Sequence, residues 1–237
     1  MPYSLPDNHR LYCIGDIHGR LDLLRTVHEK IVDDVTGFNG HKTIVYLGDY
    51  IDRGMDSKET LEFLLTDHFP DFKKVFLLGN HEQVLLQFVL NSDASIANTW
   101  FQFGGLSTIL SYGVEIRGIP TLKEIPRIHA ELIQKLPATH LTFLQNLSLS
   151  YEAGDYFFVH AGIKPKVKLN NQQAEDLLWI REEFLNSQLF HGKMIVHGHT
   201  VTAEPACLPN RMGIDTGAYS TGKLTCAVFE ETHFKFL

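Results

Sequence analysis

The sequence predicts one α/β domain, residues 1–237, built on parallel strands and carrying a helical insertion. Five short, nearly continuous apolar runs are typical of strands covered on both faces. Three of them end in glycine followed by a polar residue, and the other two run directly into a histidine. The five runs are residues 11–14, 43–47, 74–78, 156–159 and 194–196. The first three alternate with segments of helical periodicity, which indicates β-α-β units.

Two helices are expected between these strands, at 21–35 and 57–65. In the first, Leu21, Leu24, Val27, His28 and Ile31 recur at helical spacing. The stretch 83–149 has helical patterning around 82–90 and 126–136 but no comparable apolar strand, so we interpret it as a helical insertion. Residues 138–141 resemble a break between two short helices. Three more strands are expected at 211–217, 224–229 and 234–237.

An aromatic cluster in the insertion has two interpretations. Trp100, Phe101 and Phe103 precede Gly104 and Gly105. The cluster could line one wall of a substrate cleft, but aromatic clusters are more often interior, so core packing is favoured.

Composition limits the function classes. A chain of 237 residues, 44% of them hydrophobic, can bury a substantial core, and its formal charge of -7 argues against nucleic acid as the main partner. Cys13, Cys207 and Cys226 fit neither a disulfide framework nor a cysteine zinc site, which favours a reducing compartment. The first ten residues lack an export signal and no apolar run could cross a bilayer. We therefore expect a cytoplasmic monomer with no membrane partner.

The first polar cluster follows the first predicted strand. Asp16 and His18 flank one residue and precede Gly19 and a helix. Carboxylate oxygen and imidazole nitrogen together suit manganese, iron or zinc. The alternative is that Asp16 merely caps the following helix.

The second cluster offers two carboxylates and a guanidinium. Asp49 follows its strand as Asp16 does and could bridge two metals, while Arg53 suits bidentate binding of a phosphoryl group. Asp52 lies between them. Taken alone, the loop could be a surface salt-bridge turn.

The remaining candidates follow three other strands. Asn80 can supply a neutral oxygen ligand, and His81 can serve as a general acid. His160 and His199 have small neighbours that let the backbone approach a ligand. Each histidine alone would be interpreted as structural. Together, six oxygen and nitrogen donors at five strand ends indicate a metal site, because unpaired buried polar groups would each cost several kcal/mol, roughly.

The motifs as a set resemble the phosphoprotein phosphatases within the calcineurin-like metallophosphoesterases. The matching segments are Gly15-Asp16-Ile17-His18-Gly19, Gly48-Asp49-Tyr50-Ile51-Asp52-Arg53-Gly54, Gly79-Asn80-His81-Glu82, His160-Ala161-Gly162 and His197-Gly198-His199-Thr200. They span residues 11–217 in the family's order, and the Asp215-Thr216-Gly217-Ala218 ending is similar to that of the bacterial and phage branch.

The resemblance implies a four-layer α-β-β-α sandwich and a binuclear site. One metal would be held by Asp16, His18 and Asp49, and the other by Asp49, Asn80, His160 and His199. Manganese is the expected metal, with iron or zinc as alternatives.

The resemblance also assigns roles outside the ligand set. His81, oriented by Asp52, would donate a proton, and Arg53 would bind phosphoryl oxygens. Leu178-Trp179-Ile180-Arg181 is similar to the family's second phosphate-binding segment, so Arg181 is the second candidate. His197 departs from the family pattern and is expected beside the site without being a ligand.

The expected activity is metal-dependent hydrolysis of phosphate monoesters by direct attack of a hydroxide that bridges the metals. The presence of Asp52 favours a serine/threonine protein phosphatase acting on a phosphorylated protein or peptide. The alternative is a dinucleoside polyphosphate hydrolase, a related branch that tends to replace this aspartate. A binding module without activity is disfavoured because every predicted ligand is present.

Overall fold

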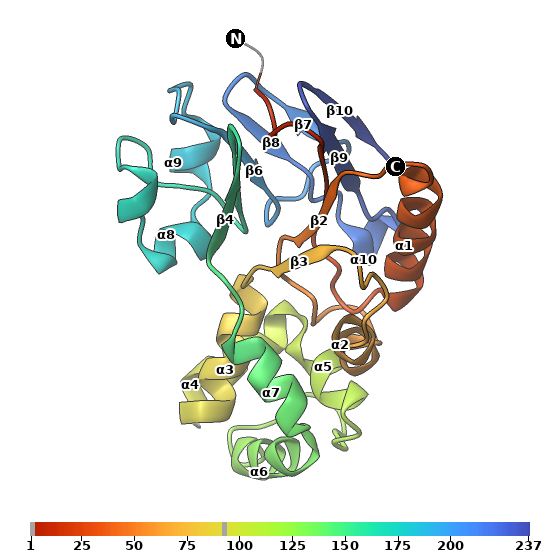
Figure 1. Cartoon of the computed structure of the whole chain (residues 1–237). Helices are drawn as coiled ribbons and strands as arrows, with labels where there is room; N and C mark the ends of the chain where they lie inside the picture. The colour runs from red at the N-terminus through yellow and green to blue at the C-terminus, as the bar shows by residue number, and fades with distance from the viewer. Residues whose placement is uncertain (1–2, 92–93) are drawn as a thin grey trace.

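The computed structural model describes residues 3–91 and 94–237. In this part of the chain the strands form two five-stranded sheets, and helices cover their outer sides (Figure 1). The four-layer α-β-β-α sandwich expected from the resemblance is therefore confirmed.

The first sheet has the strand order β10-β9-β1-β2-β3. Strands β1, β2 and β3 run parallel to one another, with β3 at the edge of the sheet. Strand β9 is antiparallel to β1, and β10 is antiparallel to β9. The bounds are β1 His9–Ile14, β2 His41–Tyr46, β3 Lys73–Phe76, β9 Cys226–Glu230 and β10 His233–Phe236.

The second sheet has the order β4-β5-β6-β8-β7. Its central strands β5, β6 and β8 are parallel, while β4 and β7 pair antiparallel at the edges. The bounds are β4 Ser150–Ala153, β5 Tyr156–Val159, β6 Met194–His197, β7 Ala206–Cys207 and β8 Arg211–Gly213.

Alternation along the strands divides the core between the layers. Leu11 of β1 and Phe158 of β5 share an apolar cluster with residues of both sheets, so this cluster lies between the sheets. Tyr12 instead packs with the helices of the first sheet, and Phe157 with those of the second. Because both faces are covered, the strands are apolar throughout, which explains the continuous runs in the sequence.

Helices cover both outer faces. The first sheet carries α1 (Leu21–Val35) and α2 (Ser57–Leu65), and the second carries α8 (Ala174–Trp179) and α9 (Glu182–Leu185). A 3₁₀ turn at Leu169–Asn171 precedes α8, and α10 (Ala218–Thr221) follows the second sheet. Within the described residues, no helix combines the length and apolar character needed to span a membrane.

The helical insertion lies below the sheets in Figure 1. It comprises α3 (Asn80–Asn91), α4 (Ala94–Trp100), a π-helical turn (Phe101–Gly105), α5 (Leu106–Ser111), α6 (Ile125–Lys135) and α7 (Ala138–Gln145). Its first helix, α3, begins at Asn80, and the insertion is followed by β4 at Ser150. The break predicted at 138–141 is misplaced, since Pro137 separates the two helices and residues 138–141 form the first turn of α7.

The sequence pattern did not predict several shorter elements. Strands β4 and β7 and the helices α4, α5, α8, α9 and α10 were not predicted. The strand expected at 211–217 ends at Gly213, after which the chain turns so that Gly217 adopts a left-handed φ of 69°. Short elements of this kind are decided by tertiary contacts more than by local pattern.

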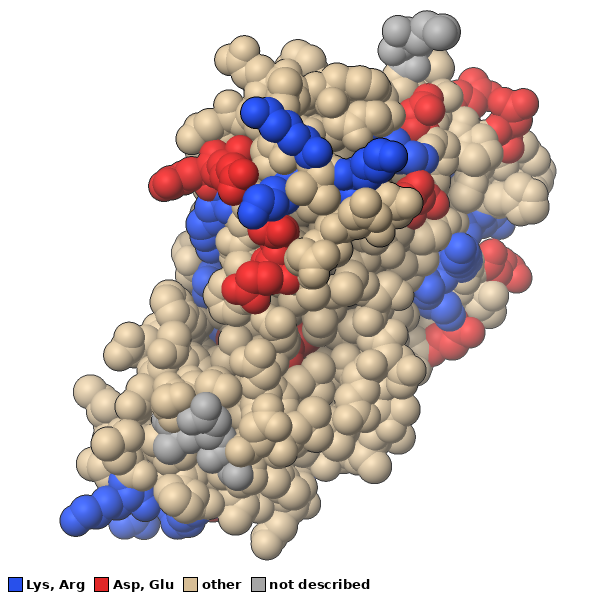
Figure 2. All heavy atoms as spheres, turned by 90° about the vertical axis from the view of Figure 1, so that its left-hand side faces the viewer, with Lys and Arg blue, Asp and Glu red and all other residues tan. Residues whose placement is uncertain are grey.

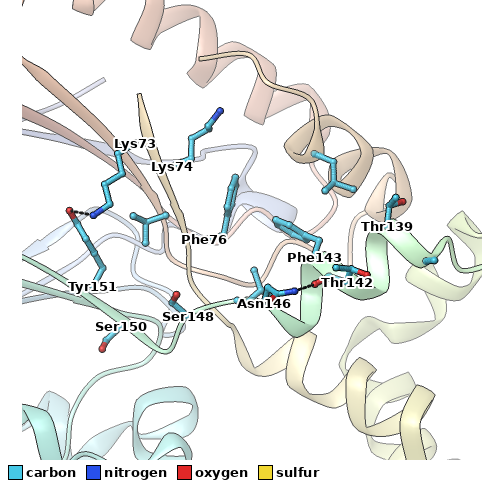
Figure 3. A pocket seen from close by; sticks show the side chains of 14 residues that line it. Lys73, Lys74, Phe76, Thr139, Thr142, Phe143, Asn146, Ser148, Ser150 and Tyr151 are labelled. Atoms are coloured by element: carbon cyan, nitrogen blue, oxygen red, sulfur yellow. Dashed lines mark hydrogen bonds between the residues drawn. The ribbon is translucent and has the colours of Figure 1, made fainter. Parts of the chain in front are cut away.

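The outer edge of β3 borders a groove of about 790 Å³ (Figure 3). Its walls come from β3, α7 and the segment that enters β4, and none of the predicted site residues lines it. Lys73, whose ammonium donates to the hydroxyl of Tyr151, and Lys74 stand on this edge. Lysines on an edge strand oppose edge-to-edge pairing between copies of a sheet.

Charge is unevenly distributed on the face that carries α8 and α9. Figure 2 shows charged side chains of both signs over the sheets in its upper half, whereas the surface of the helical insertion is mostly uncharged down to its lower end.

A buried histidine of α1 predicts a pH dependence of stability. Burial first, and then the nearby His68, lower the pKa of His28 to about 4, and the ring bonds the hydroxyl of Tyr46 at 3.0 Å. Between pH 6.5 and about 4 the unfolded chain binds a proton here that the folded chain does not. The free energy of unfolding therefore falls by roughly 1.4 kcal/mol for each unit by which the pH falls within that window, as a result of this histidine alone.

We expect the stability of His28→Phe relative to the wild type to rise by that slope as the pH falls from about 6 to 5. Urea unfolding of both proteins at several pH values measures it. A constant difference between the two proteins would contradict the assignment.

Candidate active site

The predicted site residues converge at one end of the two sheets. Asp16 and His18 follow β1, Asp49 follows β2, and Asn80 and His81 form the first turn of α3 after β3. His160 and His199 follow β5 and β6 of the second sheet. The residues that form this group are all buried, with 7% or less of each exposed: Asp16, His18, Asp49, Asn80, His81, His160 and His199.

The backbone around the site is strained. His18, Asp49, Asp52, Arg53 and His199 all have left-handed φ values, between 49° and 71°. Such values are unfavourable for residues with a side chain and persist only where surrounding contacts enforce them. Their concentration here indicates that the fold holds these side chains in set directions.

One group of donors joins the two sheets. His160 Nε2 lies 2.9 Å from Asn80 Oδ1, 3.2 Å from His199 Nδ1 and 3.5 Å from Asp49 Oδ1. Because His160 Nδ1 donates to the carbonyl of Leu47 at 2.9 Å, the Nε2 atom of the neutral ring carries a lone pair. Lone pairs therefore face one another, an arrangement that a bound cation would stabilise.

The second group is similar. His18 Nδ1 donates to the carbonyl of Ile51 at 2.9 Å, so its Nε2 presents a lone pair, 3.6 Å from Asp49 Oδ2. Asp16 is connected to the first group, since its Oδ2 accepts the backbone N–H of His199 at 2.9 Å. It therefore does not cap α1, whose first turn has no side-chain cap.

The protonation states fit metal ligands. Burial lowers the pKa of His18 to about 3 and that of His199 to about 2, so both rings are neutral at pH 7. Burial, and then the charges of Asp215 and Asp49, raise the pKa of Asp16 well above its usual range. A cation beside Asp16 would remove this cost of burying its charge.

The donor set therefore fits two cations that share Asp49. Two groups of ligand atoms lie close enough together to hold an ion, one formed by His18, Asp49 and His81 and one by Asp49, His160 and His199. His81 is also paired with Asp52, which suits it to hold a proton, so His18 and Asp49 are the ligands that the first group offers. Two buried ligand atoms, Asp16 Oδ1 and His199 Nε2, have no hydrogen-bond partner within the described part of the chain. Mixed oxygen and nitrogen donors accept manganese, iron or zinc and do not select among them.

Glu82 supports the site in a role that the sequence analysis did not assign. Its buried carboxylate accepts the backbone N–H groups of Asp49, Tyr50 and Gly79 at 2.8, 2.8 and 3.1 Å. Burial, and then the charge of Asp49, raise its pKa to about 8. A glutamate directly after Asn-His was the available signal, but two of its partners, Asp49 and Tyr50, lie on another loop.

His81 and Asp52 form a buried hydrogen-bonded pair. His81 Nδ1 lies 2.6 Å from Asp52 Oδ2, and His81 Nε2 lies 3.8 Å from Asp49 Oδ2. Burial lowers the pKa of His81, but the charges of Asp49 and Asp52 outweigh it and raise the pKa to about 9. The raised pKa favours the protonated ring, which can act as a proton donor.

The aromatic cluster serves both proposed purposes. Trp100 is 1% exposed and packs in the core, as favoured, but its Nε1–H also donates to Asp52 Oδ2 at 2.7 Å. Phe103 is 55% exposed and lines a cavity beside the site. The sequence gives no signal for a further partner, Thr108, whose hydroxyl lies 2.5 Å from Asp52 Oδ1.

Both predicted arginines reach the same cavity, of about 240 Å³. Arg53 lies over the ring of Tyr219 at 4.4 Å, with Nη2 3.4 Å from His81 Nε2. Arg181 Nη1 donates to the carbonyl of His199 at 3.2 Å. The lining of the cavity combines charged and polar side chains with apolar ones. The polar residues are Arg53, Asn80, His81, Thr99, Arg181 and His199, and the apolar residues are Val84, Trp100, Phe103 and Trp179.

His197 turns away from the ligand groups. Its ring packs edge-on against Phe184 at 5.1 Å, and Nε2 lies 3.5 Å from Arg211 Nη1. Alternation along β6 explains this, since Val196 faces the core between the sheets while His197 follows Ile195 to the helix side. We infer that His197 has a packing role.

Residues 9–220 match the family described as calcineurin-like phosphoesterase. The chain belongs to this family, and the resemblance seen in the motifs is confirmed. It is therefore a metallophosphoesterase domain with a site for divalent metals.

Individual relatives differ in their named substrates. The chain is 32% identical over 166 residues to a zinc-dependent endopolyphosphatase of Saccharomyces cerevisiae, covering 67% of this chain but about half, 48%, of that protein. It is 26% identical to the asymmetrical bis(5'-nucleosyl)-tetraphosphatase PrpE of Bacillus mycoides, covering 90% and 87% of the two chains. A cold-active protein-tyrosine phosphatase of Shewanella has the same fold, with TM-score 0.62, 16% identity and coverage of 99% and 83%.

Removing the shared carboxylate should remove metal. We expect Asp49→Asn to bind fewer ions than the wild type after loading with Mn²⁺ and dialysis, because both ligand groups lose charge. Metal content is measured by elemental analysis. His197→Asn, which changes a buried histidine outside the groups, should keep the wild-type content; equal content in all three proteins would exclude Asp49 as a bridge.

Proposed function

We propose that the protein hydrolyses phosphate monoesters with an alcohol leaving group, as in phosphoserine and phosphothreonine of proteins. The observation that carries this proposal is the buried pair of His81 and Asp52. An alkoxide is a poor leaving group and needs a proton as the ester bond breaks, whereas a phosphate leaving group does not. A protonated imidazole held beside the metal ligands supplies that proton.

The other residues of the cavity have complementary roles. Asp16, His18 and Asp49 would hold one cation, and Asp49, Asn80, His160 and His199 the other. The chemistry that two such cations supply when bound is activation of water and neutralisation of phosphate charge. Arg53 and Arg181 enter the same cavity and are placed to bind phosphoryl oxygens, which stabilises the charge that develops in the transition state. No covalent phosphoenzyme is required.

The acid is tested by substitution. His81→Asn should lower kcat for a phosphoserine peptide by roughly 10²- to 10⁴-fold, the usual contribution of general acid catalysis. Phosphate release in the presence of Mn²⁺ is the assay, and metal content should be unchanged. Undiminished turnover in this variant would show that His81 is not the acid.

A second candidate, hydrolysis of dinucleoside polyphosphates, is favoured by the comparisons over the protein phosphatase interpretation. The PrpE relative aligns over nearly its whole length, and the yeast relative is also named for a phosphoanhydride substrate. The apolar part of the cavity supports this candidate too, because Phe103 and Trp179 are partly exposed and could stack against a base.

One side-by-side assay separates the candidates. We expect the wild-type protein to release phosphate from phosphoserine and phosphothreonine peptides faster than it cleaves diadenosine tetraphosphate, with Mn²⁺, Fe²⁺ or Zn²⁺ compared in parallel. Efficient cleavage of the dinucleotide without turnover of any phosphopeptide would replace the first proposal by the second.

A further inference from the structure

The turn that carries Asp52 and Arg53 is held from outside by the helical insertion. Both residues have left-handed φ values, 71° and 68°, so the turn needs external contacts to persist. The backbone N–H of Arg53 donates to the carbonyl of Gly104 at 3.1 Å. Gly104 has a φ of 105°, and a Cβ there would lie 2.7 Å from the backbone nitrogen of Arg53, so only glycine permits this approach.

The insertion also supplies the polar partners of Asp52. The carboxylate, 0% exposed, accepts Trp100 Nε1–H at 2.7 Å on Oδ2 and the hydroxyl of Thr108 at 2.5 Å on Oδ1. Thr108 in turn accepts the backbone N–H of Asp52 at 2.9 Å. His81 Nδ1 also donates to Oδ2. Each carboxylate oxygen therefore accepts a hydrogen bond from the insertion, Oδ2 from Trp100 and Oδ1 from Thr108, which fixes the plane of the carboxylate.

We propose that Trp100 and Thr108 are positioning residues for the proton donor, because they fix the carboxylate that orients His81. This inference rests on the proposed hydrolysis of phosphate esters with His81 as the acid. It assigns the insertion a part in the chemistry, because Trp100 of α4 and Thr108 of α5 hold the carboxylate of Asp52 that orients the proton donor His81. Trp100 also lines the cavity beside the site, but the role proposed for both residues acts through Asp52.

A purely structural role and a positioning role differ in their dependence on the leaving group. Phenyl phosphate has a poor leaving group and 4-nitrophenyl phosphate a good one, so a misplaced acid slows the first ester selectively. We expect Thr108→Val, which keeps the shape but removes the hydroxyl, to lower kcat for phenyl phosphate about 10- to 100-fold. For 4-nitrophenyl phosphate the fall should be less than about 3-fold, with KM and metal content unchanged.

Matched variants separate the hydroxyl from packing. Thr108→Ser retains the donor and should keep wild-type rates on both esters, and Trp100→Phe, which removes the indole N–H, should show the same selectivity as Thr108→Val. In a His81→Asn background, Thr108→Val should cause no further loss, because the acid that it positions is gone. An equal fall on both esters, or an additive loss in the double variant, would overturn the proposal.

A readout without turnover uses the two tryptophans of the chain. Trp100 donates to Asp52, whereas Trp179 donates to the amide oxygen of Gln83 at 2.7 Å and serves as the internal control. In the metal-free protein labelled with ¹⁵N, Asp52→Asn should shift the indole resonance of Trp100 and leave that of Trp179 in place. An unmoved Trp100 resonance would contradict the contact.

The outcomes also distinguish this inference from the proposed function. If the wild type hydrolyses the two aryl phosphates but no phosphopeptide, and the variants show the leaving-group selectivity, the positioning role stands and the protein phosphatase proposal fails. If phosphopeptides are hydrolysed but the variants show no leaving-group selectivity, the protein phosphatase proposal stands and the positioning role fails. If phosphopeptides are not hydrolysed and the selectivity is absent, both proposals fail.

Discussion

The structure depends on one constraint, the burial of a carboxylate among lone pairs. Asp49 lies between His18 and His160, whose Nδ1 atoms donate to backbone carbonyls, so the Nε2 atoms of these two rings face Asp49 as acceptors. Without cations such an arrangement would leave buried polar atoms unsatisfied, at a cost of several kcal/mol, roughly. Cations held by these residues would therefore stabilise this end of the two sheets.

Every layer around this centre contributes to holding it. The first sheet supplies Asp16, His18 and Asp49, and the second supplies His160 and His199, so the two sheets must pack in one register for the ligands to meet. Glu82 ties the loop of Asp49 to the start of α3, because its carboxylate accepts the backbone N–H groups of Asp49 and Tyr50. The left-handed backbone at five site residues is the local strain that these contacts sustain.

The geometry of the site and the names of the relatives indicate different classes of substrate. Two relatives are named for phosphoanhydride substrates, in which the leaving group needs little help from an acid. The pair of His81 and Asp52 favours an alkoxide leaving group, because a histidine with its pKa raised to about 9 retains a proton to donate. The cavity beside them is lined by two arginines, Arg53 and Arg181, and by apolar side chains that include Phe103 and Trp179.

Much of the site was open to prediction from the sequence, because each ligand directly follows an apolar strand and the carboxyl ends of parallel strands collect at one edge. The sequence by itself determined the layered α/β class, the long strands and helices and the identity of the ligand candidates. It did not decide the partners of Asp52, since Trp100 and Thr108 are 48 and 56 residues away and carry no local pattern that links them to it. Nor did it place His197, whose side-chain direction follows from strand alternation once the register of β6 is set. Tertiary structure decided these points, because hydrogen bonds between distant loops depend on how layers pack and not on neighbouring residues.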